Sequence, residues 1–528
     1  MGGENHMQFP DSFFEDEVRH GFYIPALMKR AWAAQLEVLQ DIARVCEKYH
    51  IRWFADEGTL LGAVRHNGFI PWDDDVDITM FREDYIRFNA VVEKELPDYH
   101  IFIPPNIGSK HCIYTCLSNS DSIRWSKTHM EKYHGFPLIT GIDIFPLDYI
   151  APDPDEEELR ESLATIVRSA AQAINEKSQD TQEMKSRISQ IEELLGVQFD
   201  NCRDMKEQLF SLLEGILAMY NTDMSAREAA VMHYWIWYRT HKVPIRCFDD
   251  EIMLPFETIQ IPVPAGYDEI LTIKYGDYMK FSYSGDEHNY PYYDFMIKRL
   301  ANLYGENQLM YHYCFSEDDL NMRTSDGIRN QPPQGAGARK EIVFLAWKSS
   351  MWNQLRPAWE FASSQPDCQV FVIPVPYFHR DTDGNLGEMK WGGQFPDDVP
   401  ITNYKDYDFE NRRPAMIVIQ NPYDECNPST SVHPSFYARN LRKYTEQLVY
   451  IPWFITNEIE PNDHKSLYNM QYYAAMPGVV LADQIIVQSG QMRVVYISFL
   501  TTFAGENTKK IWEEKIICNF QIPFLKMK

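Results

Sequence analysis

The sequence predicts an α/β protein with two domains, and three observations carry this prediction. In residues 1–305, acidic residues end short strands that alternate with helical segments, which indicates a β-α-β core. In residues 341–528, short apolar strands alternate with helices, which is typical of a parallel, Rossmann-like sheet. Between them, residues 306–340 lose hydrophobic periodicity and end in QPPQGAGARK, a Pro- and Gly-rich run that indicates a linker.

The first domain begins with a predicted helix at residues 26–50, where apolar residues recur at helical spacing directly after Pro25. A strand is predicted at residues 51–55, and a short helix follows the Gly58-Thr59 turn. The remaining elements of this core are an acidic strand, a helix, a β segment and a second acidic strand, predicted at residues 69–80, 82–96, 101–117 and 141–148.

A helical insertion is predicted at about residues 153–240, where three apolar stripes recur at helical spacing. Asp153-Pro154 is a good N-cap and first-turn pair, and Gly196 is expected to end the second helix. Residues 246–279 return to short or edge strands, because their prolines cannot donate to a sheet ladder, and end in a short helix that a glycine closes.

The second domain is predicted to hold six strands, at residues 341–347, 369–374, 416–420, 448–453, 484–488 and 494–499. The helices predicted among them include residues 351–363, 435–445 and 509–515. No GxGxxG motif follows the first of these strands, so we predict no dinucleotide site there.

The net charge limits the classes of partner. The chain has 50 Lys and Arg residues against 76 Asp and Glu residues, a formal charge of −26. This balance argues against nucleic acid as the main partner, because phosphate backbones attract basic side chains, and against a polybasic membrane anchor. It does not exclude a phosphorylated substrate, since a bound metal ion supplies positive charge locally.

The cysteines and the apolar runs bear on the compartment. Nine cysteines with irregular spacing predict a reduced protein without a disulfide framework. The cluster His111-Cys112 with Cys116 has ligand-like spacing, and buried thiols are favoured over a zinc site. The sequence has no apolar run of membrane-spanning length and starts without a signal-peptide pattern. We expect a cytoplasmic protein that contacts the inner face of the membrane peripherally when its acceptor is lipid-linked; the oligomeric state is not predicted.

Four carboxylates, Asp73, Asp74, Asp75 and Asp77, lie so close in sequence that they repel one another unless a cation sits among them. Successive side chains of a strand point to opposite faces, so Asp75 and Asp77 face the same way while Val76 points into the core. Such a pair holds one divalent ion, Mg²⁺ or Mn²⁺, through oxygen ligands. The alternative is a solvated acidic turn, which the apolar flanks of the run disfavour. Asp73 and Asp74 either shape the turn or bind a second ion.

Asp143 lies on the second acidic strand, on the face opposite Ile142 and Ile144. We expect it to be a third metal ligand or the group that takes the proton from an acceptor hydroxyl. The ligand role is favoured because a metal-bound carboxylate is a weak base. The alternative is a strand-end acid that caps a turn. Asp75, Asp77 and Asp143 are therefore the predicted catalytic and metal-binding residues.

Phosphate contacts are expected around the short helix that follows the Gly58-Thr59 turn. Gly58 allows a close approach of the backbone, and Thr59 offers a hydroxyl and an N–H. Arg65 can pair with a phosphate through two hydrogen bonds, with a surface salt bridge as the alternative, and His66 contacts a phosphate or a base. The predicted substrate-binding residues are Gly58, Thr59, Gly62, Arg65, His66 and Asp74.

The stretch GTLLGAVRHNGFIPWDDDVDITMFREDY resembles the signature of the LicD family, bacterial phosphocholine transferases related to fukutin-type proteins. GIDIFPLDYI and PFETIQIPVPAGYDEILTIKYGDYM resemble later motifs of the family, so the resemblance covers about residues 20–300. It implies a nucleotidyltransferase-like fold. It also implies transfer of a phospho-alcohol, namely phosphocholine, glycerol phosphate or ribitol phosphate, from a CDP-linked donor to a glycan or lipid-linked glycan acceptor. Such acceptors include cell-surface, teichoic-acid and lipopolysaccharide precursors, and CMP is released.

Residues 340–515 resemble the front half of CDP-glycerol glycerophosphotransferases, on stretches such as AWKSSMW, CQVFVIPVPYF and IQNPYDECNPSTSVHPSFYARNLRKYTEQLVYIPWF. This implies a Rossmann-like half of a GT-B fold. Those enzymes bind the donor in their rear half, which is not expected here because the chain stops at Lys528. We therefore expect an acceptor-binding or docking role, with Asp424 and His433 as polar candidates and a structural role as the alternative for both.

Two other classes of function remain open on the sequence. A nucleotidyltransferase would use the same fold to move a nucleotide to a small acceptor, and it would not release CMP from a CDP-alcohol. A non-catalytic scaffold would hold a glycan-synthesis partner through the second domain. The DDDVD spacing disfavours a scaffold for the first domain but not for the second.

Overall fold

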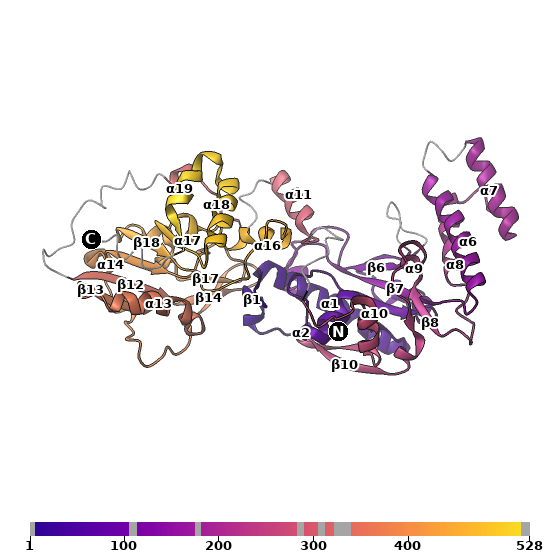
Figure 1. Cartoon of the computed structure of the whole chain (residues 1–528), viewed down its shortest axis with the longest axis horizontal. Helices are drawn as coiled ribbons and strands as arrows, with labels where there is room; N and C mark the ends of the chain where they lie inside the picture. The colour runs from indigo at the N-terminus through magenta and orange to yellow at the C-terminus, as the bar shows by residue number, and fades with distance from the viewer. Residues whose placement is uncertain are drawn as a thin grey trace. The chain divides into compact units, whose positions relative to one another are not determined.

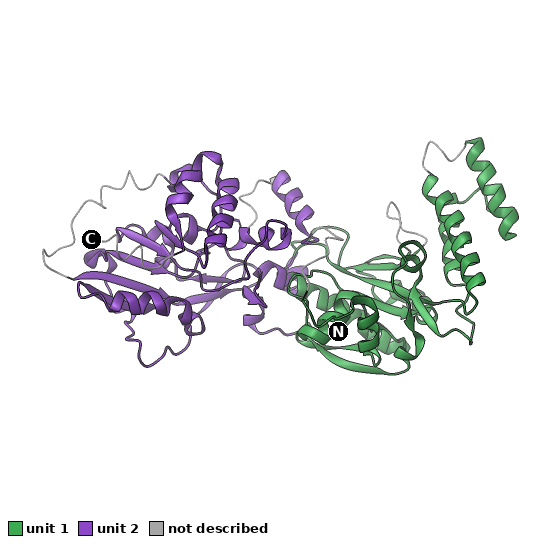
Figure 2. Cartoon of the chain, viewed as in Figure 1, with its two compact units in different colours: residues 1–7, 31–125, 137–285 green, residues 8–30, 126–136, 286–528 purple. Residues whose placement is uncertain are grey.

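The structure is a computed structural model that describes residues 6–104, 113–174, 181–281, 290–304, 312–320 and 339–518. It confirms the α/β class and contains two compact units (Figure 2). Unit 1 comprises residues 1–7, 31–125 and 137–285, and unit 2 comprises residues 8–30, 126–136 and 286–528. This grouping differs from the contiguous boundaries that the sequence suggested, because residues 8–30 and 126–136 pack with unit 2. Most of the predicted linker, residues 306–311 and 321–338, lies outside the described residues.

Unit 1 is built on a mixed sheet with the strand order β3-β4-β7-β6-β5, to which β8 and β9 add beside β7. β4 and β7 run parallel, whereas β3, β6 and β8 pair antiparallel with their neighbours. The strands are β3 (Phe54–Ala55), β4 (Asp77–Phe81), β5 (His100–Phe102), β6 (Thr115–Ser118), β7 (Gly141–Tyr149), β8 (Glu228–Val231) and β9 (Val243–Pro244).

The acidic strand is shorter than predicted, because β4 begins only at Asp77. Residues 69–76 form a turn instead, in which the Asp73 N–H donates to the carbonyl of Ile70 at 2.9 Å. Pro71 has no N–H for a sheet ladder, which disfavours an extended strand here.

The helices of this core follow the prediction closely. α1 (Ala26–Tyr49) starts directly after Pro25, and α2 (Glu57–His66) follows the predicted turn. The predicted helix at 82–96 consists of α3 (Arg82–Asn89) and α4 (Val92–Glu95). The proline-rich segment is the two-stranded hairpin of β10 (Glu251–Phe256) and β11 (Ile259–Pro264), and Gly276, at φ +66°, closes α10 (Tyr267–Tyr275).

The helices predicted for the insertion are present as α6 (Pro154–Ala173), α7 (Gln182–Leu195) and α8 (Met205–Leu217), and α9 (Met232–Tyr238) follows β8 (Figure 1). Asp153 caps α6 and Gly196 ends α7, both as expected. The apolar faces of these helices pack into one core. A buried ion pair ties the insertion to the sheet: Arg82 donates to both oxygens of Asp148 on β7, at 2.8 and 2.7 Å, and to Glu214 on α8 at 2.8 Å.

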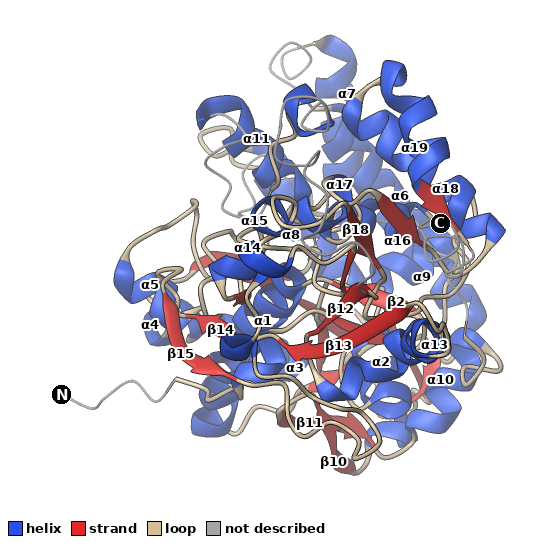
Figure 3. Cartoon of the chain, turned by 90° about the vertical axis from the view of Figure 1, so that its left-hand side faces the viewer, coloured by secondary structure: helices blue, strands red, loops and turns tan. Residues whose placement is uncertain are grey.

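Unit 2 contains the predicted parallel sheet, in the order β13-β12-β16-β18-β19-β20, with helices around it (Figure 3). The chain moves from β12 to β13 on one side and then to β16 on the other, the doubly wound pattern. Its strands are β12 (Lys340–Ala346), β13 (Cys368–Pro374), β16 (Met416–Ile419), β18 (Gln447–Tyr450), β19 (Gln484–Ile486) and β20 (Ile516–Ile517). A three-stranded antiparallel sheet of β14 (Tyr377–Arg380), β15 (Leu386–Lys390) and β17 (Thr430–Val432) was not predicted.

The strand predicted at residues 494–499 is wrong, because these residues lie inside α18 (Gly490–Ala504). Ser489 caps this helix by accepting a hydrogen bond from the Met492 N–H at 3.0 Å. Met492, Tyr496 and Leu500 are buried at a spacing of four residues, which is the period of a helix face. The β-branched run VVYISF favours a strand locally, but packing and the cap decide for the helix. The helix predicted at 435–445 is only the short η6 (Pro434–Phe436) and α15 (Ala438–Leu441).

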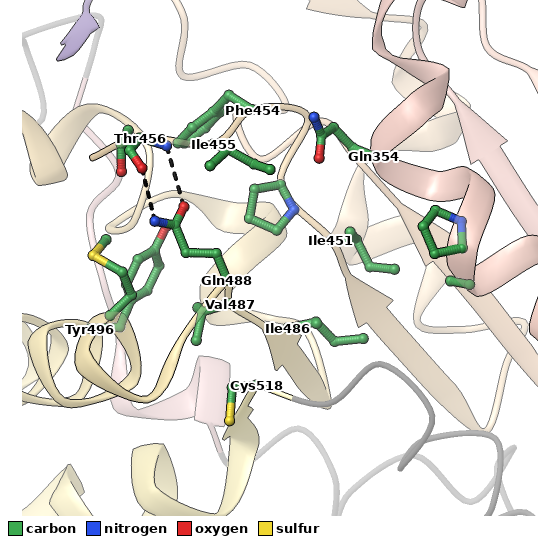
Figure 4. Close-up of a pocket in the computed structure, with 14 residues that line it drawn as sticks. Gln354, Ile451, Phe454, Ile455, Thr456, Ile486, Val487, Gln488, Tyr496 and Cys518 are labelled. Atoms are coloured by element: carbon green, nitrogen blue, oxygen red, sulfur yellow. Dashed lines mark hydrogen bonds between the residues drawn. The ribbon is translucent and has the colours of Figure 1, made fainter. Parts of the chain in front are cut away.

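A cavity of about 220 Å³ lies at the carboxyl ends of β18 and β19, beside α18 and α13 (Trp352–Ser363) (Figure 4). Its walls are mainly apolar and include Ile451, Phe454 and Ile486. The amide of Gln488 exchanges two hydrogen bonds with the backbone of Thr456, at 3.3 and 2.8 Å. None of the lining residues is charged.

The start of unit 2 holds an acid whose ionisation opposes folding. Asp16 accepts hydrogen bonds from the Tyr23 hydroxyl at 2.9 Å, the Ala26 N–H at 3.1 Å and the Asn427 amide at 2.5 Å. Burial outweighs these hydrogen bonds and raises the pKa of Asp16 to about 6. The folded protein therefore binds a proton that the unfolded chain releases near pH 4, so this site stabilises less as the pH rises from 4 to 6.

We expect Asp16→Asn to remove this pH dependence. Relative to the variant, the wild type should lose about 2 kcal/mol of unfolding free energy between pH 4.5 and pH 7.5, because a shift of one pKa unit corresponds to about 1.4 kcal/mol and partial exposure reduces the effect. Urea denaturation at the two pH values measures the difference. Parallel pH profiles for the two proteins would contradict the assignment.

Within the described part of the chain, no helix is long and apolar enough to cross a membrane.

Candidate active site

The two acidic strands meet as predicted. β4 and β7 are parallel neighbours, and Asp77 is paired in register with Asp143. The Asp143 N–H donates to the carbonyl of Val76 at 3.3 Å. Val76 is buried, while Asp75 and Asp77 on either side of it are half-buried, which matches the predicted alternation. Asp77 and Asp143, 66 residues apart in sequence, therefore lie on adjacent strands of one sheet, and Asp75 lies in the turn that leads into β4.

Electrostatics show that these acids act on one another. Burial raises the pKa of Asp77 well above its ordinary value, and the negative charges of Asp75, Asp143, Glu57 and Asp73 raise it further, in that order. Like charges that interact in this way are costly unless a cation compensates them. An all-carboxylate set of oxygen donors is also what Mg²⁺ and Mn²⁺ prefer. The donor chemistry of these residues therefore suits a divalent metal ion, while the three described acids whose carboxylate oxygens all lie within 4.8 Å of one another are Asp73, Asp74 and Asp75.

The start of α2 is bonded to the first acidic strand. The Asp77 N–H donates to the Thr59 hydroxyl at 2.9 Å, and the Asp56 N–H donates to the Asp77 carbonyl at 3.1 Å. A Cβ at Gly58 would lie only 2.4 Å from a carboxylate oxygen of Asp73. The acidic turn therefore packs closely against Gly58, and any other residue at this position would force the Asp73 side chain to move. Thr59 and Gly58 thus lie beside the carboxylates.

Lys274 and Tyr275 on α10 belong to this site, and the sequence reasoning missed them. The Lys274 ammonium binds the carboxylates of Asp56 and Glu57, the latter at 2.8 Å, and the Tyr275 hydroxyl donates to Glu57 at 2.8 Å. Although burial alone would lower the pKa of Lys274, the charges of Asp56 and Glu57 raise it above its ordinary value. Both residues lie in the KYGDY run, which the sequence analysis noted as part of a motif. The sequence alone did not indicate that they contact Asp56 and Glu57, because these acids lie far away in the chain.

Arg65 and His66 lie at the other end of α2, about 9 Å along the helix axis from Thr59. Arg65 donates to the Tyr278 carbonyl at 2.8 Å and to His66 at 2.9 Å, and its guanidinium lies over the Phe281 ring at 5.1 Å. Burial lowers its pKa. These contacts do not link Arg65 or His66 to the carboxylates. The role of both residues as phosphate ligands stays a prediction.

Gly62 has a packing role that the sequence did not predict. A Cβ there would lie 2.4 Å from the carbonyl oxygen of Gly68, so the turn after α2 needs the bare backbone. Glu257 supports the same turn, because its carboxylate accepts a hydrogen bond from the Phe69 N–H at 3.1 Å. The substrate-binding role of Gly62 stays a prediction.

Asp73 and Asp74 form a second acidic group with Asp75. One carboxylate oxygen of each of the three lies within 4.8 Å of the others. The Asp74 N–H also donates to Asp73 at 3.2 Å, and the Asp74 carbonyl accepts from Gln35 at 2.9 Å. These bonds shape the turn, and the short distances also suit an ion, so both roles expected for Asp73 and Asp74 remain open.

Three other predicted residues lie elsewhere. Asp424 and His433 in unit 2 accept hydrogen bonds from the backbone N–H groups of Ala438, at 2.8 Å, and Ser435, at 3.3 Å, so the structure gives both a structural role. Burial raises the pKa of Asp424. Cys116 lies half-buried on β6, opposite Asp143. Its proposed neighbours His111 and Cys112 lie outside the described residues.

Comparisons with known proteins match the part of the chain that holds this site. Residues 50–156 match the family model described as LicD/FKTN/FKRP, nucleotidyltransferase domain. The chain is 26% identical over 263 residues to the lipopolysaccharide cholinephosphotransferase LicD of Haemophilus influenzae, a match that covers 48% of this chain and 91% of the relative. It is 41% identical over 116 residues to an uncharacterized protein of Rickettsia prowazekii, covering 21% of this chain and 44% of that protein.

A shorter stretch is similar to a mammalian enzyme. The chain is 43% identical over 53 residues to the ribitol 5-phosphate transferase FKRP of Homo sapiens, which is 9% of this chain and 11% of that protein. The match thus spans a small part of the relative. The resemblance of residues 340–515 to CDP-glycerol glycerophosphotransferases stays a prediction.

Proposed function

Because residues 50–156 belong to the LicD family, we propose that this phosphotransferase moves a phospho-alcohol from a CDP-activated donor to the hydroxyl of a glycan or lipid-linked glycan, with release of CMP. The observation that carries the proposal is the register of Asp77 with Asp143 on parallel strands, with Asp75 beside them. In the reaction, the acceptor oxygen forms a bond to phosphorus, the bond from phosphorus to CMP breaks, and the acceptor hydroxyl loses its proton.

Asp75, Asp77 and Asp143 would hold a Mg²⁺ or Mn²⁺ ion, which supplies the positive charge that stabilises a reacting pyrophosphate. The chain itself positions these ligands. Thr59 fixes the backbone of Asp77, and Val76 anchors the strand in the core. Lys274 pairs with two further acids, Asp56 and Glu57, that lie next to the ligands, and its single charge offsets part of theirs. Such prearranged charge is what phosphoryl transfer requires, because it needs positioning more than covalent chemistry.

The donor class is tested by incubating the full chain with CDP-choline, CDP-ribitol and CDP-glycerol in turn, with Mg²⁺ or Mn²⁺ and an acceptor glycan, and following CMP. We expect CMP from one of these donors and none after chelation of the metal. The absence of CMP with every donor would contradict the proposal. Pyrophosphate release from a nucleoside triphosphate would instead favour the transfer of a nucleotide.

For unit 2 we propose acceptor binding or docking, near the membrane when the acceptor is lipid-linked. The doubly wound sheet supports this proposal, because ligands of such sheets bind at the carboxyl ends of the strands. The uncharged cavity at the ends of β18 and β19 lies at that edge.

A further inference from the structure

A cavity of about 1060 Å³ lies within unit 1, between α6 and the β8–β9 side of the sheet. Its walls come from the turn after β7, the first half of α6, the segment that leads into β8 and the end of α9 (Figure 1). Ile150 lines it and lies seven residues beyond Asp143, about 23 Å along an extended strand. The cavity and the carboxylates therefore lie at opposite ends of β7.

Trp235 on α9 is half-buried and forms part of the cavity wall. Its indole N–H donates to Glu157 on α6 at 3.1 Å. Glu157 is buried, and its other oxygen accepts hydrogen bonds from the Ala151 N–H, at 3.0 Å, and from Arg160. A buried carboxylate thus fixes the edge of the indole. A ring held in this way loses little freedom when a ligand packs on it.

Polar side chains surround this ring. Arg239 and Lys242 lie over it, at 5.3 and 5.7 Å from its centroid, near the outer limit of such contacts. Arg239 binds Glu161 on α6, and Lys242 binds Glu228 at 2.5 Å. These four side chains are about one-third to one-half exposed, so N–H donors and carboxylate acceptors are both accessible beside the ring.

The face of α6 that lines the cavity is also polar. Glu158, Ser162 and Thr165 lie on it at helical spacing, and all three are exposed. Ala164 and Val167 lie on another face of the same helix and are buried in the core of the insertion. The hydroxyl groups of Ser162 and Thr165 both donate and accept hydrogen bonds. α6 therefore adds groups of both kinds to the wall opposite the indole.

The charges of the lining nearly balance. It has four acidic and three basic side chains, and the buried acid among them, Glu157, is also paired with Arg160. The first turn of α6 is itself acidic, which opposes an anion at the start of this helix. A phosphate group needs an excess of basic donors, which this lining lacks. The cavity therefore suits an uncharged ligand that has an apolar face and many hydroxyl groups.

We propose that this cavity binds uncharged sugar residues of a glycan. A pyranose ring packs its face of C–H groups on an indole, and its hydroxyls then meet donors and acceptors at the rim of the ring, where Arg239 and Glu161 lie. The volume is at the upper end of the range for ligand pockets. The inference goes beyond the proposed reaction, because it concerns a second site, remote from the carboxylates, that holds a glycan whichever group is transferred.

Saturation-transfer NMR on the full chain, without donor or metal, tests the site. The neutral probes are maltotriose, galactobiose and N,N′-diacetylchitobiose, and we expect at least one to bind. Trp235→Ala should weaken that binding about tenfold, because the sugar loses its aromatic contact. Trp125→Ala is the matched control: Trp125 is an exposed tryptophan of unit 1 that does not line the cavity, so its loss should leave sugar binding unchanged.

A second pair of variants blocks the cavity without touching the buried indole contact. Ser162→Tyr introduces a large side chain from an exposed position on the lining and should also weaken sugar binding about tenfold, since it fills space that the ligand needs. Ser169→Tyr carries the same substitution two turns further along α6, at an exposed position outside the cavity, and should bind sugar like the wild type.

Failure of all three sugars to bind, or equal binding by Ser162→Tyr and Ser169→Tyr, would overturn the proposal. Binding of inorganic phosphate that Ser162→Tyr abolishes and that salt weakens would also overturn it, because the cavity would then be an anion site. Loss of sugar binding in Asp77→Asn would place the sugar at the carboxylates instead. If sugar binding is lost in Ser162→Tyr alone but no donor yields CMP, the proposed function fails and the sugar site stands.

Discussion

Asp77→Asn should lower CMP release at least a thousandfold, about 4 kcal/mol in the barrier, and at the same time stabilise the metal-free protein. The first effect follows because Asp77 lies between Asp75 and Asp143, so its loss breaks the proposed ligand set at its centre. The second follows because four neighbouring acids oppose the ionisation of Asp77, and a neutral amide removes that repulsion. Thermal unfolding with and without Mn²⁺ measures the second effect independently of activity.

In this experiment, Mn²⁺ should raise the Tm of the wild type and leave the Tm of Asp77→Asn unchanged. Asp73→Asn is the matched control, because Asp73 belongs to the same acidic run but to the second acidic group. It should keep the Mn²⁺-induced rise in Tm. The reverse result, with the rise lost in Asp73→Asn and kept in Asp77→Asn, would place the ion among Asp73, Asp74 and Asp75 and contradict the assignment of Asp77 and Asp143.

Lys274→Met should destabilise the fold by about 3–5 kcal/mol, because breaking a buried ion pair leaves its partners with uncompensated charge. Lys274 and Asp56 are both almost inaccessible, with 7% of each side chain exposed. Activity should fall with stability, since Asp56 and Glu57 form the start of α2, whose Thr59 holds Asp77. Urea denaturation gives the loss of unfolding free energy, and Mn²⁺-dependent CMP release gives the loss of activity.

Lys242→Met is the matched control for this variant. Lys242 also pairs with a glutamate, Glu228, at 2.5 Å, but both side chains are about 40% exposed, so its loss should change stability by less than about 1 kcal/mol. The charges of Asp56 and Glu57 raise the pKa of Lys274 on folding, so the contribution of the lysine to stability is lost as the pH rises above about 10. A loss for Lys274→Met no larger than that for Lys242→Met would contradict the buried role.

The local pattern of the sequence predicted most elements of both units and the core of the site. Alternation around Val76 predicted that Asp75 and Asp77 share a face, and the strand pattern around Asp143 predicted its neighbouring position. Patterns of this kind are local, because a strand or helix face repeats every two or every 3.6 residues. The same reasoning misassigned residues 494–499, since a β-branched run is compatible with a buried helix face and only packing decides between them.

The sequence by itself therefore determined the acidic strands, the α/β class and the family resemblance of the first domain, because a short segment of the sequence encodes each of these features. Only the tertiary structure decided that Lys274 meets Asp56 and Glu57, more than 200 residues earlier in the chain, and that residues 8–30 pack with unit 2. Such contacts depend on which strands pair and in what register, and no periodicity within a single segment encodes a partner so distant in the chain.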